Sequence, residues 1–351
     1  MIAQLTDPGI RIVSLTITEG GYNIDQSTGE FILDNPTIQR DLTDPRQPSS
    51  VFGYIVESLR IRQERGVPPF TIMSCDNLPG NGDVARHSVV TFARALDADL
   101  ADWIEQNVAF PNGMVDRITP VTTDADREFV QRAFGIQDAW PVITEPFIQW
   151  VLEDHFCNAR PAYERVGVQV VDDVMPYELL KLRMLNASHQ AMAYIGMLRG
   201  HAFVHEAVGD TSIQQFLQNW FAEARPTLPE APGIDVDAYI ESLFTRYSNP
   251  YIADTLARLA VDASDRIPKF VLPVVRANLA AGRSVETGAA IIANWMKHLL
   301  SGTDIIDPLA EQLIPLANDV DQFLAVGSVF GELSESLILR EAVAESFHRD
   351  S

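Results

Sequence analysis

The stretch FTIMSCDNLPGNG, residues 70–82, decides the fold. It opens with a short apolar run, which is typical of a strand that is buried on both faces. The run is followed by Asp, Asn, Pro and Gly, the residues that favour turns. A helical pattern then begins near Asp83 and continues towards Asn107. A buried strand, a turn and a helix in this order predict an α/β layer.

The rest of the first 175 residues shows the same alternation of strand and helix patterns. Residues 10–17 read IRIVSLTI and predict a second buried strand, and residues 50–65 predict an amphipathic helix that ends at Gly66. Residues 141–144 and 168–171 are further strand candidates. We therefore expect residues 1–175 to form an α/β domain with a parallel or mixed sheet.

Helical periodicity replaces this alternation after residue 176. Prolines and glycines separate the helical segments. The segments are residues 177–198, 212–224, 236–246, 252–260, 286–300 and 331–346. We expect residues 176–351 to form a second domain that is mostly α-helical.

The composition is that of an ordinary globular protein, with 46% hydrophobic and 21% charged residues among 351. A net charge of −22 argues against a general binder of nucleic acid, which needs a basic face. The N-terminus does not resemble a signal peptide, and no run of about 18 apolar residues could span a membrane. Cys75 and Cys157 fit neither a metal motif nor a disulfide framework. These features predict a cytoplasmic protein without nucleic-acid or membrane partners.

The sequence lacks the glycine-rich turn of dinucleotide-binding enzymes, which normally follows the first strand. Gly20 and Gly21 follow the strand expected at residues 10–17, but no GxGxxG pattern follows and no helix is expected to open there. The turn after the second strand contains GNG at residues 80–82 and also lacks the third glycine.

The segment KLRMLNASH, residues 181–189, carries the strongest chemical signal. At 100° per residue from Lys181, Glu178 falls at about 60°, His189 at about 80° and Asn186 at about 140°, so all four share one face of a helix. A buried lysine among polar partners can act as a base near neutral pH, and an asparagine can stabilise an alkoxide. This chemistry suits hydride transfer between an alcohol and a ketone. On periodicity alone, a solvated helix face is the more frequent explanation.

Two further motifs have ordinary structural explanations as well as functional ones. The turn SCDNLPGNG, residues 74–82, follows a predicted strand, where ligands bind in α/β sheets, but such a turn can simply cap the next helix. The pair Asp116 and Arg117 is expected in a short loop, where such a pair is usually a local salt bridge. Taken singly, none of these motifs fixes a function.

Together, the motifs resemble the polyol-specific long-chain dehydrogenase/reductase family, which includes mannitol 2-dehydrogenase, D-arabinitol dehydrogenase and fructuronate reductase. The resemblance covers nearly the whole chain. It rests on six ordered blocks: ITEGGY at 17–22, SCDNLPGNG at 74–82, FPNGMVDRITP at 110–120, TEPFIQWVLEDHF at 144–156, KLRMLNASH at 181–189 and SNPYIADTLARLAVDASDRIPKF at 248–270.

The resemblance implies a role for each matching residue. Lys181 would be the catalytic base in alcohol oxidation and the acid in ketone reduction. Asn77 and Asn186 would bind the reacting oxygen, and His189 would contact a substrate hydroxyl.

The resemblance also implies contacts around this centre. Asp116, Arg258 and Arg266 would be further substrate contacts, although mannitol-type members can have lysine at position 266. The acidic residues Glu19 and Glu178 would relay the proton of the lysine to water. Asn77 and Val115 would contact the cofactor, which is NAD or NADP with NAD favoured, and no metal is implied.

Members of this family carry a further N-terminal segment, which holds the first βαβ unit and the glycine-rich turn. The resemblance therefore implies an incomplete Rossmann-type domain at residues 1–175, followed by the helical substrate domain at 176–351. We expect a fragment or a misplaced start, rather than a degenerate remnant, because the matching catalytic positions are intact. The complete enzyme is expected to be a monomer.

Three functions remain open from the sequence. The first is a polyol dehydrogenase, with D-mannitol and D-fructose favoured; FVHE at residues 203–206 favours this branch. The second is a fructuronate reductase or a D-arabinitol dehydrogenase, and a uronate carboxylate would need a cation such as Arg258 or Arg266. The third is a non-catalytic protein that binds a sugar or a partner, which the missing phosphate-binding turn would explain.

Overall fold

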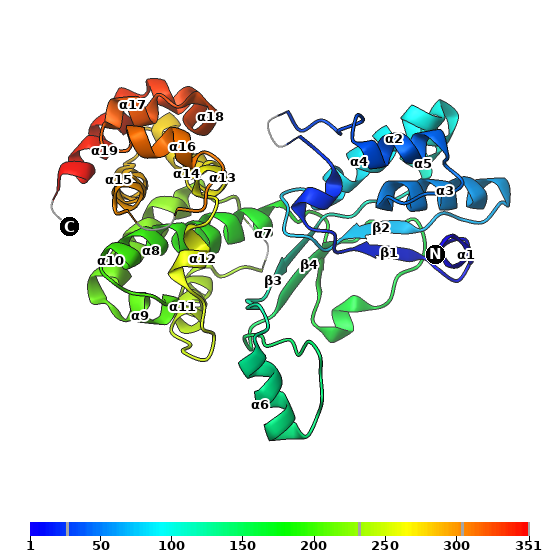
Figure 1. The fold of residues 1–351 in the computed structure, drawn as a ribbon, viewed down its shortest axis with the longest axis horizontal. Coiled ribbons are helices and arrows are strands. Elements are labelled where there is room, and N and C mark those ends of the chain that lie inside the picture. Colours follow the sequence, from blue (N-terminus) through cyan, green and yellow to red (C-terminus); the bar gives the residue numbers. More distant parts are fainter. Residues whose placement is uncertain (26–27, 231–232, 303–304, 350–351) are drawn as a thin grey trace. The chain divides into compact units, whose positions relative to one another are not determined.

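The computed structural model describes residues 1–25, 28–230, 233–302 and 305–349 (Figure 1). The chain folds into two compact units. The α/β unit consists of Met1–Arg117 and Ile148–Glu178, and the helical unit consists of Ile118–Phe147 and Leu179–Ser351. Residues 118–147 thus group with the helical unit although they fall within the first predicted domain. The division at residues 175 and 176 stays a prediction.

Short strands form two sheets in the α/β unit, one of two strands and one of three. Strand β1 (Ile12–Leu15) pairs in parallel with β2 (Thr71–Ser74). Strand β3 (Gly113–Asp116) pairs antiparallel with β4 (Gln149–Glu153), which pairs in parallel with β5 (Gln169–Val171). The three-stranded sheet thus has mixed strand pairing. All four residues of β2 are buried. Strands at residues 10–17, 70–75 and 168–171 are confirmed, with shorter bounds.

Two strand predictions were wrong. Residues 141–144 form no strand, and the sheet gains its strand at Gln149–Glu153 instead. Asp116 lies at the end of β3 rather than in a loop. A strand that begins at a glycine and ends at an aspartate has low β propensity, so the pattern concealed it. The expected strand at 141–144 begins with a proline, which cannot donate to a ladder.

Helices pack against the β1–β2 sheet and supply most of the residues of the hydrophobic core around it. Helix α3 (Val51–Glu64) begins at Ser50, whose side chain accepts the Gly53 N–H at 3.0 Å. The single helix expected from Asp83 to Asn107 is instead two, α4 (Asn81–Leu96) and α5 (Ala98–Asn107). They separate at Asp97, which has extended backbone angles and caps α5. The shorter elements are α1 (Ile2–Leu5), η1 (Glu19–Tyr22), α2 (Pro36–Thr43), η2 (Tyr163–Val166) and α7 (Met175–Leu180).

The helical unit packs around helix α8 (Ala187–Leu198), which is buried along most of its length. Helices α10 (Thr211–Ala224), α12 (Leu256–Ala260) and α15 (Glu286–Leu300) pack against α8, and α19 (Leu337–His348) packs against α15. Trp220 and Trp295 are fully buried in this core. The other helices are α6 (Asp124–Phe134), α9 (Val204–Gly209), η4 (Arg225–Thr227), α11 (Val236–Tyr247), α13 (Ala263–Phe270), α14 (Leu272–Ala280), α16 (Ala310–Leu313), η5 (Ile314–Leu316), α17 (Val320–Leu324), α18 (Gly327–Phe330) and η6 (Gly331–Glu335).

The all-helical character of this half is confirmed, but three segments differ from the prediction. Residues 252–255 are not helical, and the last predicted helix divides into the 3₁₀ helix η6 and α19. The helix expected over residues 177–198 is interrupted by the π-helix η3 (Lys181–Asn186). No helix among the described residues has the length and apolar character needed to cross a membrane.

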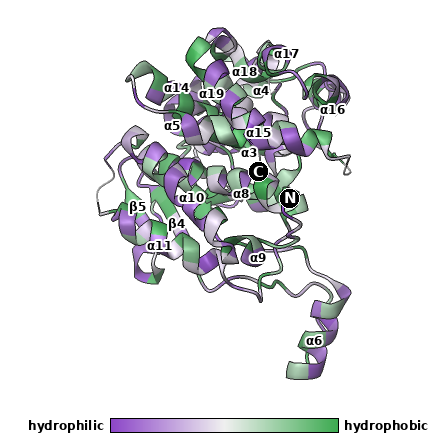
Figure 2. Ribbon diagram, turned by 90° about the vertical axis from the view of Figure 1, so that its left-hand side faces the viewer, coloured by the Kyte–Doolittle hydropathy of each residue, from purple (hydrophilic) through white to green (hydrophobic). Residues whose placement is uncertain are grey.

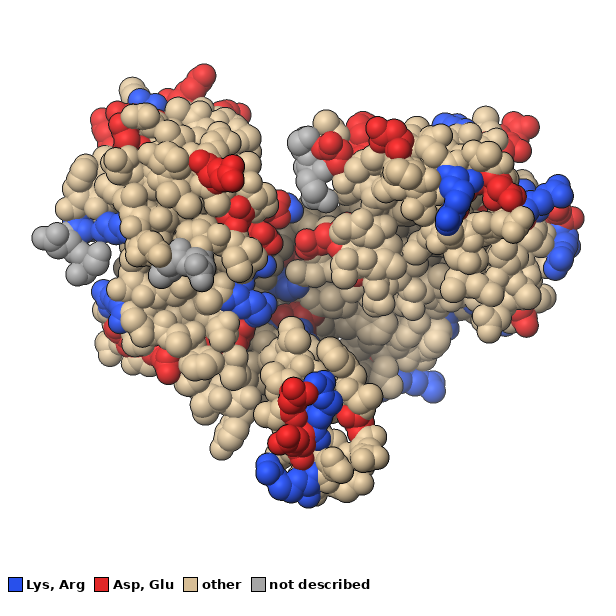
Figure 3. Space-filling view, viewed as in Figure 1, with Lys and Arg blue, Asp and Glu red and all other residues tan. Residues whose placement is uncertain are grey.

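Helix α6 belongs to the helical unit, and none of its residues is buried. Hydrophilic and hydrophobic residues alternate along it in Figure 2. Figure 3 shows anionic and cationic side chains mixed over this helix. A capping box at Thr123 and Asp126 begins the helix, and Gly135, with φ of 70°, ends it.

The N-terminus of α15 is capped by a carboxylate from another helix. Glu223 of α10 accepts the N–H groups of Thr287 at 2.8 Å and Gly288 at 2.9 Å. Gly288 is required here because a Cβ atom would lie 2.6 Å from the Val275 side chain. Burial raises the pKa of Glu223 above its ordinary value of 4.5, and this effect outweighs the two backbone hydrogen bonds, which lower it.

This raised pKa predicts a pH-dependent stability. The folded state binds the Glu223 proton more tightly than the unfolded state does, so protonation favours folding. The contribution is therefore complete below the ordinary glutamate pKa and is lost as pH rises through the raised pKa. Urea unfolding should show this loss in the wild type and not in Glu223→Gln. The exposed Glu311→Gln variant is the control; equal pH slopes in the wild type and Glu223→Gln would contradict the prediction.

Candidate active site

Five of the predicted site residues belong to the α/β unit, and two of them follow parallel strands. Glu19 follows β1 and Asn77 follows β2, and these strands run side by side. The loops that hold Glu19 and Asn77 therefore leave the sheet at the same edge, where ligands bind in α/β folds. Val115 and Asp116 are the last two residues of β3, and Asp116 is buried.

A buried asparagine joins the turn after β2 to strand β3. The Asn81 amide donates to the carbonyls of Gly113 at 2.8 Å and Asp76 at 3.0 Å, and its oxygen accepts the Gly113 N–H at 2.9 Å. Asn81 is fully buried. It therefore fixes the turn that carries Asn77 to the strand that carries Val115 and Asp116.

The turn at residues 76–82 does not fit a pyrophosphate group. Two N–H groups in the first turn of α4 already have a hydrogen-bond acceptor. The side-chain oxygen of Asn112 accepts the N–H of Gly82 at 2.8 Å and the N–H of Asp83 at 3.2 Å. The Gly80 N–H donates to the carboxylate of Glu178 at 3.1 Å. A Cβ atom at Gly82 would lie 2.5 Å from the Phe110 carbonyl oxygen, so this glycine allows chain packing rather than the approach of a ligand.

Glu178 is the fifth predicted residue of this unit. Its bond to Gly80 ties α7 to the turn that carries Asn77. Glu178 thus belongs to the α/β unit, whereas Lys181, three residues later, belongs to the helical unit. The chain passes from one unit to the other between these two residues.

The π-helix η3 carries Lys181 at its first position and Asn186 at its last. π turns are rare and frequently occur at functional sites. Their i→i+5 hydrogen bonds place more residues in a turn, so the angles predicted at 100° per residue do not apply across η3. Lys181 is 7% and His189 is 8% exposed, which rules out the solvated helix face for these two side chains.

Tyr247 of α11 packs beside His189 in a way that sequence analysis missed. The two ring centroids are 5.0 Å apart. The Tyr247 hydroxyl lies 2.7 Å from Ser188 Oγ and donates to the Leu185 carbonyl at 3.3 Å. Tyr247 therefore contacts residues adjacent to both Asn186 and His189, and it fixes the end of the π turn.

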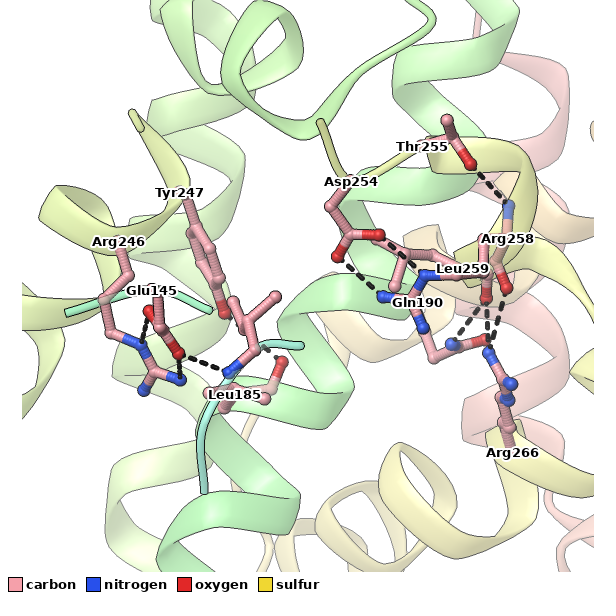
Figure 4. Close-up of polar contacts among 11 residues, drawn as sticks. Glu145, Leu185, Gln190, Arg246, Tyr247, Asp254, Thr255, Arg258, Leu259 and Arg266 are labelled. Carbon is pink, nitrogen blue, oxygen red and sulfur yellow. Dashed lines mark hydrogen bonds and ion pairs between the residues drawn. The ribbon is translucent and has the colours of Figure 1, made fainter. Parts of the chain in front are cut away.

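A buried ion pair holds the start and end of the segment at residues 118–147. Glu145 accepts from Arg246 through both carboxylate oxygens, at 3.0 Å and 2.8 Å, and also accepts the Ile118 N–H at 2.6 Å (Figure 4). The Arg246 guanidinium lies 4.0 Å from the centre of the Phe147 ring. Both charged side chains are almost fully buried.

The two predicted arginine contacts lie on neighbouring segments of the helical unit. Arg258 makes a bidentate pair with the buried carboxylate of Asp254, at 2.7 Å and 2.6 Å (Figure 4). Arg266 donates to the carbonyl oxygen of Leu259 at 3.1 Å, and the Gln190 amide donates to the same oxygen at 3.0 Å. The Asp254 carboxylate offsets the charge of Arg258 and holds its guanidinium plane.

The predicted residues thus form two groups. Glu19, Asn77, Val115, Asp116 and Glu178 lie in the α/β unit, and Lys181, Asn186, His189, Arg258 and Arg266 lie in the helical unit. Within the described ranges, no cluster of three His, Cys, Asp or Glu side chains could hold a metal ion. Both cysteines are free, and burial raises the pKa of Cys75 above its ordinary value.

Family models match both halves of the chain. Residues 1–165 match the mannitol dehydrogenase Rossmann domain, and residues 173–349 match the mannitol dehydrogenase C-terminal domain. A mannitol 2-dehydrogenase of Phaeosphaeria nodorum is 41% identical over 343 residues, which are 95% of this chain and 60% of that protein. The chain thus spans less than two thirds of the length of this relative.

Two solved structures are similar over nearly the whole chain. The Pseudomonas fluorescens mannitol 2-dehydrogenase in ternary complex with NAD and D-mannitol is 45% identical, with a TM-score of 0.84 over 99% of this chain and 73% of that one. A substrate-free D-sorbitol dehydrogenase is 39% identical, with a TM-score of 0.91 over 97% of this chain and 73% of that one. The predicted order, a Rossmann-type domain followed by a helical domain, is confirmed.

Proposed function

Since the chain belongs to the mannitol dehydrogenase family, we propose that the protein is an NAD-dependent, zinc-independent polyol dehydrogenase. It interconverts a sugar alcohol and a ketose, and D-mannitol and D-fructose are the favoured pair. The observation that carries the proposal is the buried π turn with Lys181 and Asn186 at its ends. The similar structure described as a complex with NAD and D-mannitol supports the choice of cofactor and substrate.

The proposed roles follow from the chemistry of each group. Lys181 takes the proton of the substrate hydroxyl during oxidation and returns it during reduction. The amides of Asn77 and Asn186 donate hydrogen bonds to the oxygen on which negative charge develops. Tyr247 holds the ring of His189, which contacts a second hydroxyl. Glu178 and Glu19 pass the proton between the lysine and water.

The nicotinamide cofactor, when bound, exchanges the hydride with the carbon that carries this oxygen. Asn77 and Val115 would hold its nicotinamide end, because both lie where strands of the α/β unit end. The turn at residues 76–82 is not expected to supply the pyrophosphate contacts, since the N–H groups of Gly80 and Gly82 are bonded to Glu178 and Asn112.

The setting of Arg258 suits a neutral polyol better than a uronate. A carboxylate is bound most strongly by a cation whose charge is not already offset by another carboxylate. Arg258 already shares two hydrogen bonds with Asp254. We therefore place fructuronate second, together with D-arabinitol and D-sorbitol as neutral alternatives.

A comparison of substrates tests this proposal. Oxidation of NADH by the protein should be faster with D-fructose than with D-fructuronate at equal concentration. NADPH in place of NADH measures the cofactor preference in the same assay. Faster turnover of D-fructuronate would overturn the substrate assignment, and no turnover of any ketose or uronate would overturn the enzymatic function.

A further inference from the structure

The carboxylate of Asp76 joins the two loops that leave the parallel strands β1 and β2. Its Oδ2 atom accepts the Ile17 N–H at 3.0 Å, and its Oδ1 atom accepts the Thr18 N–H at 2.9 Å. These bonds span nearly sixty residues of chain. Each oxygen of one carboxylate therefore holds a separate backbone group of the loop that leads to Glu19.

Two buried hydroxyls support this carboxylate from the side of the core. The Tyr22 hydroxyl donates to Asp76 Oδ2 at 2.7 Å and lies 2.5 Å from Ser74 Oγ. Tyr22 and Ser74 are 0% and 1% exposed. Burial raises the pKa of the Tyr22 phenol far above its ordinary value, so the phenol keeps the proton that it donates. Ser88 Oγ donates to the Tyr22 carbonyl at 3.0 Å.

The loop that Asp76 holds contains a strained residue. Thr18 has φ of 62° and ψ of 169°. This region is essentially restricted to glycine, and other residues keep it only where the surroundings impose it. The bond from the Thr18 N–H to Asp76 is such a constraint. The residue that follows the strained backbone is Glu19, which begins η1.

From this geometry we infer that Asp76 is a positioning residue, which holds the strained Thr18 backbone and thereby fixes Glu19 beside the turn that carries Asn77. The inference rests on the proposed function, in which Glu19 relays a proton and Asn77 binds the reacting oxygen. Asp76 itself need not touch substrate. It acts through the two loops, with Tyr22 and Ser74 holding its carboxylate in place.

The Asp76→Asn variant tests this role. An asparagine keeps one acceptor oxygen but turns an N–H₂ group towards the second backbone N–H, so one loop bond is lost. Misplacement of a proton relay lowers kcat more than it changes the affinity for substrate. We expect kcat for D-mannitol oxidation to fall by about 10- to 100-fold, with KM changed less than about threefold.

Asp41 offers a matched control in the same unit. Its buried carboxylate also uses both oxygens, accepting the N–H groups of Ser49 at 3.0 Å and Ser50 at 2.7 Å. The Asp41→Asn variant loses the same kind of bond in front of α3, away from Glu19 and Asn77. It should lower the melting temperature and leave kcat of the folded protein within about twofold, because no site residue depends on it.

A rescue variant separates positioning from a loss of stability. Glycine adopts the backbone angles of Thr18 without strain. Thr18→Gly in the Asp76→Asn background should therefore raise kcat by about tenfold above that of Asp76→Asn alone, because the loop no longer needs two bonds to stay in place. If Asp76→Asn lowers kcat no more than Asp41→Asn does, or if Thr18→Gly restores nothing, the positioning role is overturned.

Hydrogen exchange keeps this test separate from the proposed function. The backbone amides of Ile17 and Thr18 should exchange at least about tenfold faster in Asp76→Asn than in the wild type, whatever the substrate. A wild type without polyol turnover would overturn the proposed function, and faster exchange would then still support the loop constraint. Unchanged exchange in Asp76→Asn would overturn the constraint in either case.

Discussion

Replacing Lys181 by alanine is expected to lower kcat for polyol oxidation by about 10²- to 10⁴-fold, the contribution typical of a general base. The side chain is buried at the start of the π turn, and the proposed function makes it the base for a substrate hydroxyl. The variant keeps the backbone of η3, and alanine favours helix. Steady-state rates with D-mannitol and NAD, measured below the melting temperature of both proteins, give the ratio.

The control for this variant is Lys269→Ala. Lys269 forms a half-buried i,i+4 pair with Asp265 on α13, and its loss should leave kcat unchanged. A Lys181→Ala protein that keeps more than about a tenth of the wild-type kcat would remove Lys181 from the role of base. A rate loss that only follows unfolding, visible by circular dichroism, would do the same.

Removal of Arg246 should produce the largest loss of stability of the variants considered. Arg246→Ala leaves the buried carboxylate of Glu145 without its cation, and breaking such a pair costs about 3–5 kcal/mol. The loss includes the contact with Phe147. Urea unfolding is followed by tryptophan fluorescence, because Trp220 and Trp295 are buried in the core of the helical unit and become exposed when that unit unfolds.

An exposed arginine provides the comparison. Arg225 pairs with Asp237 at the surface, and Arg225→Ala should leave the unfolding midpoint nearly unchanged. A double variant that replaces both Glu145 and Arg246 by apolar residues should recover part of the loss, because neither charge of this pair is then left buried without the other. An unfolding midpoint of Arg246→Ala equal to that of Arg225→Ala would contradict the assignment of a buried ion pair.

The sequence predicted the fold where hydrophobic patterns were strong. Residues 10–17 and 70–75 are apolar runs that became parallel strands, and residues 286–300 form a helix with the predicted bounds. The break at Asp97 was missed although aspartate favours the cap position of a helix. Apolar spacing continues across such a break, so the periodicity alone did not reveal it.

The π turn could not be found from a helical wheel. Leu182, Met184 and Leu185 are all buried, so the segment is apolar on several sides and its spacing does not distinguish 3.6 residues per turn from a wider turn. The residues of the predicted site were chosen from motifs, and their roles stay predictions. What the motifs did give is the placement of Asn77 after a strand and of Lys181 on a buried helical segment.

The partners of these residues lie far away in the sequence. Tyr247 contacts His189 across 58 positions, and Tyr22 reaches Asp76 across 54. Asp254 holds Arg258 from only four positions away, a spacing typical of helical ion pairs, and could have been proposed from the sequence. Contacts between segments far apart in the sequence depend on the topology of the fold, and the spacing of residues within a motif gives no information about that topology.

Transfer of a labelled hydride from the cofactor to the sugar would demonstrate the proposed polyol dehydrogenase activity. The protein is incubated with D-fructose and NADH that carries deuterium at the transferable position of its nicotinamide ring, and the sugar product is analysed by chromatography and mass spectrometry. We expect D-mannitol labelled at the former carbonyl carbon, with labelling reduced by about 10²-fold or more in Lys181→Ala. Absence of a labelled hexitol from the wild-type reaction, or undiminished labelling by Lys181→Ala, would contradict it.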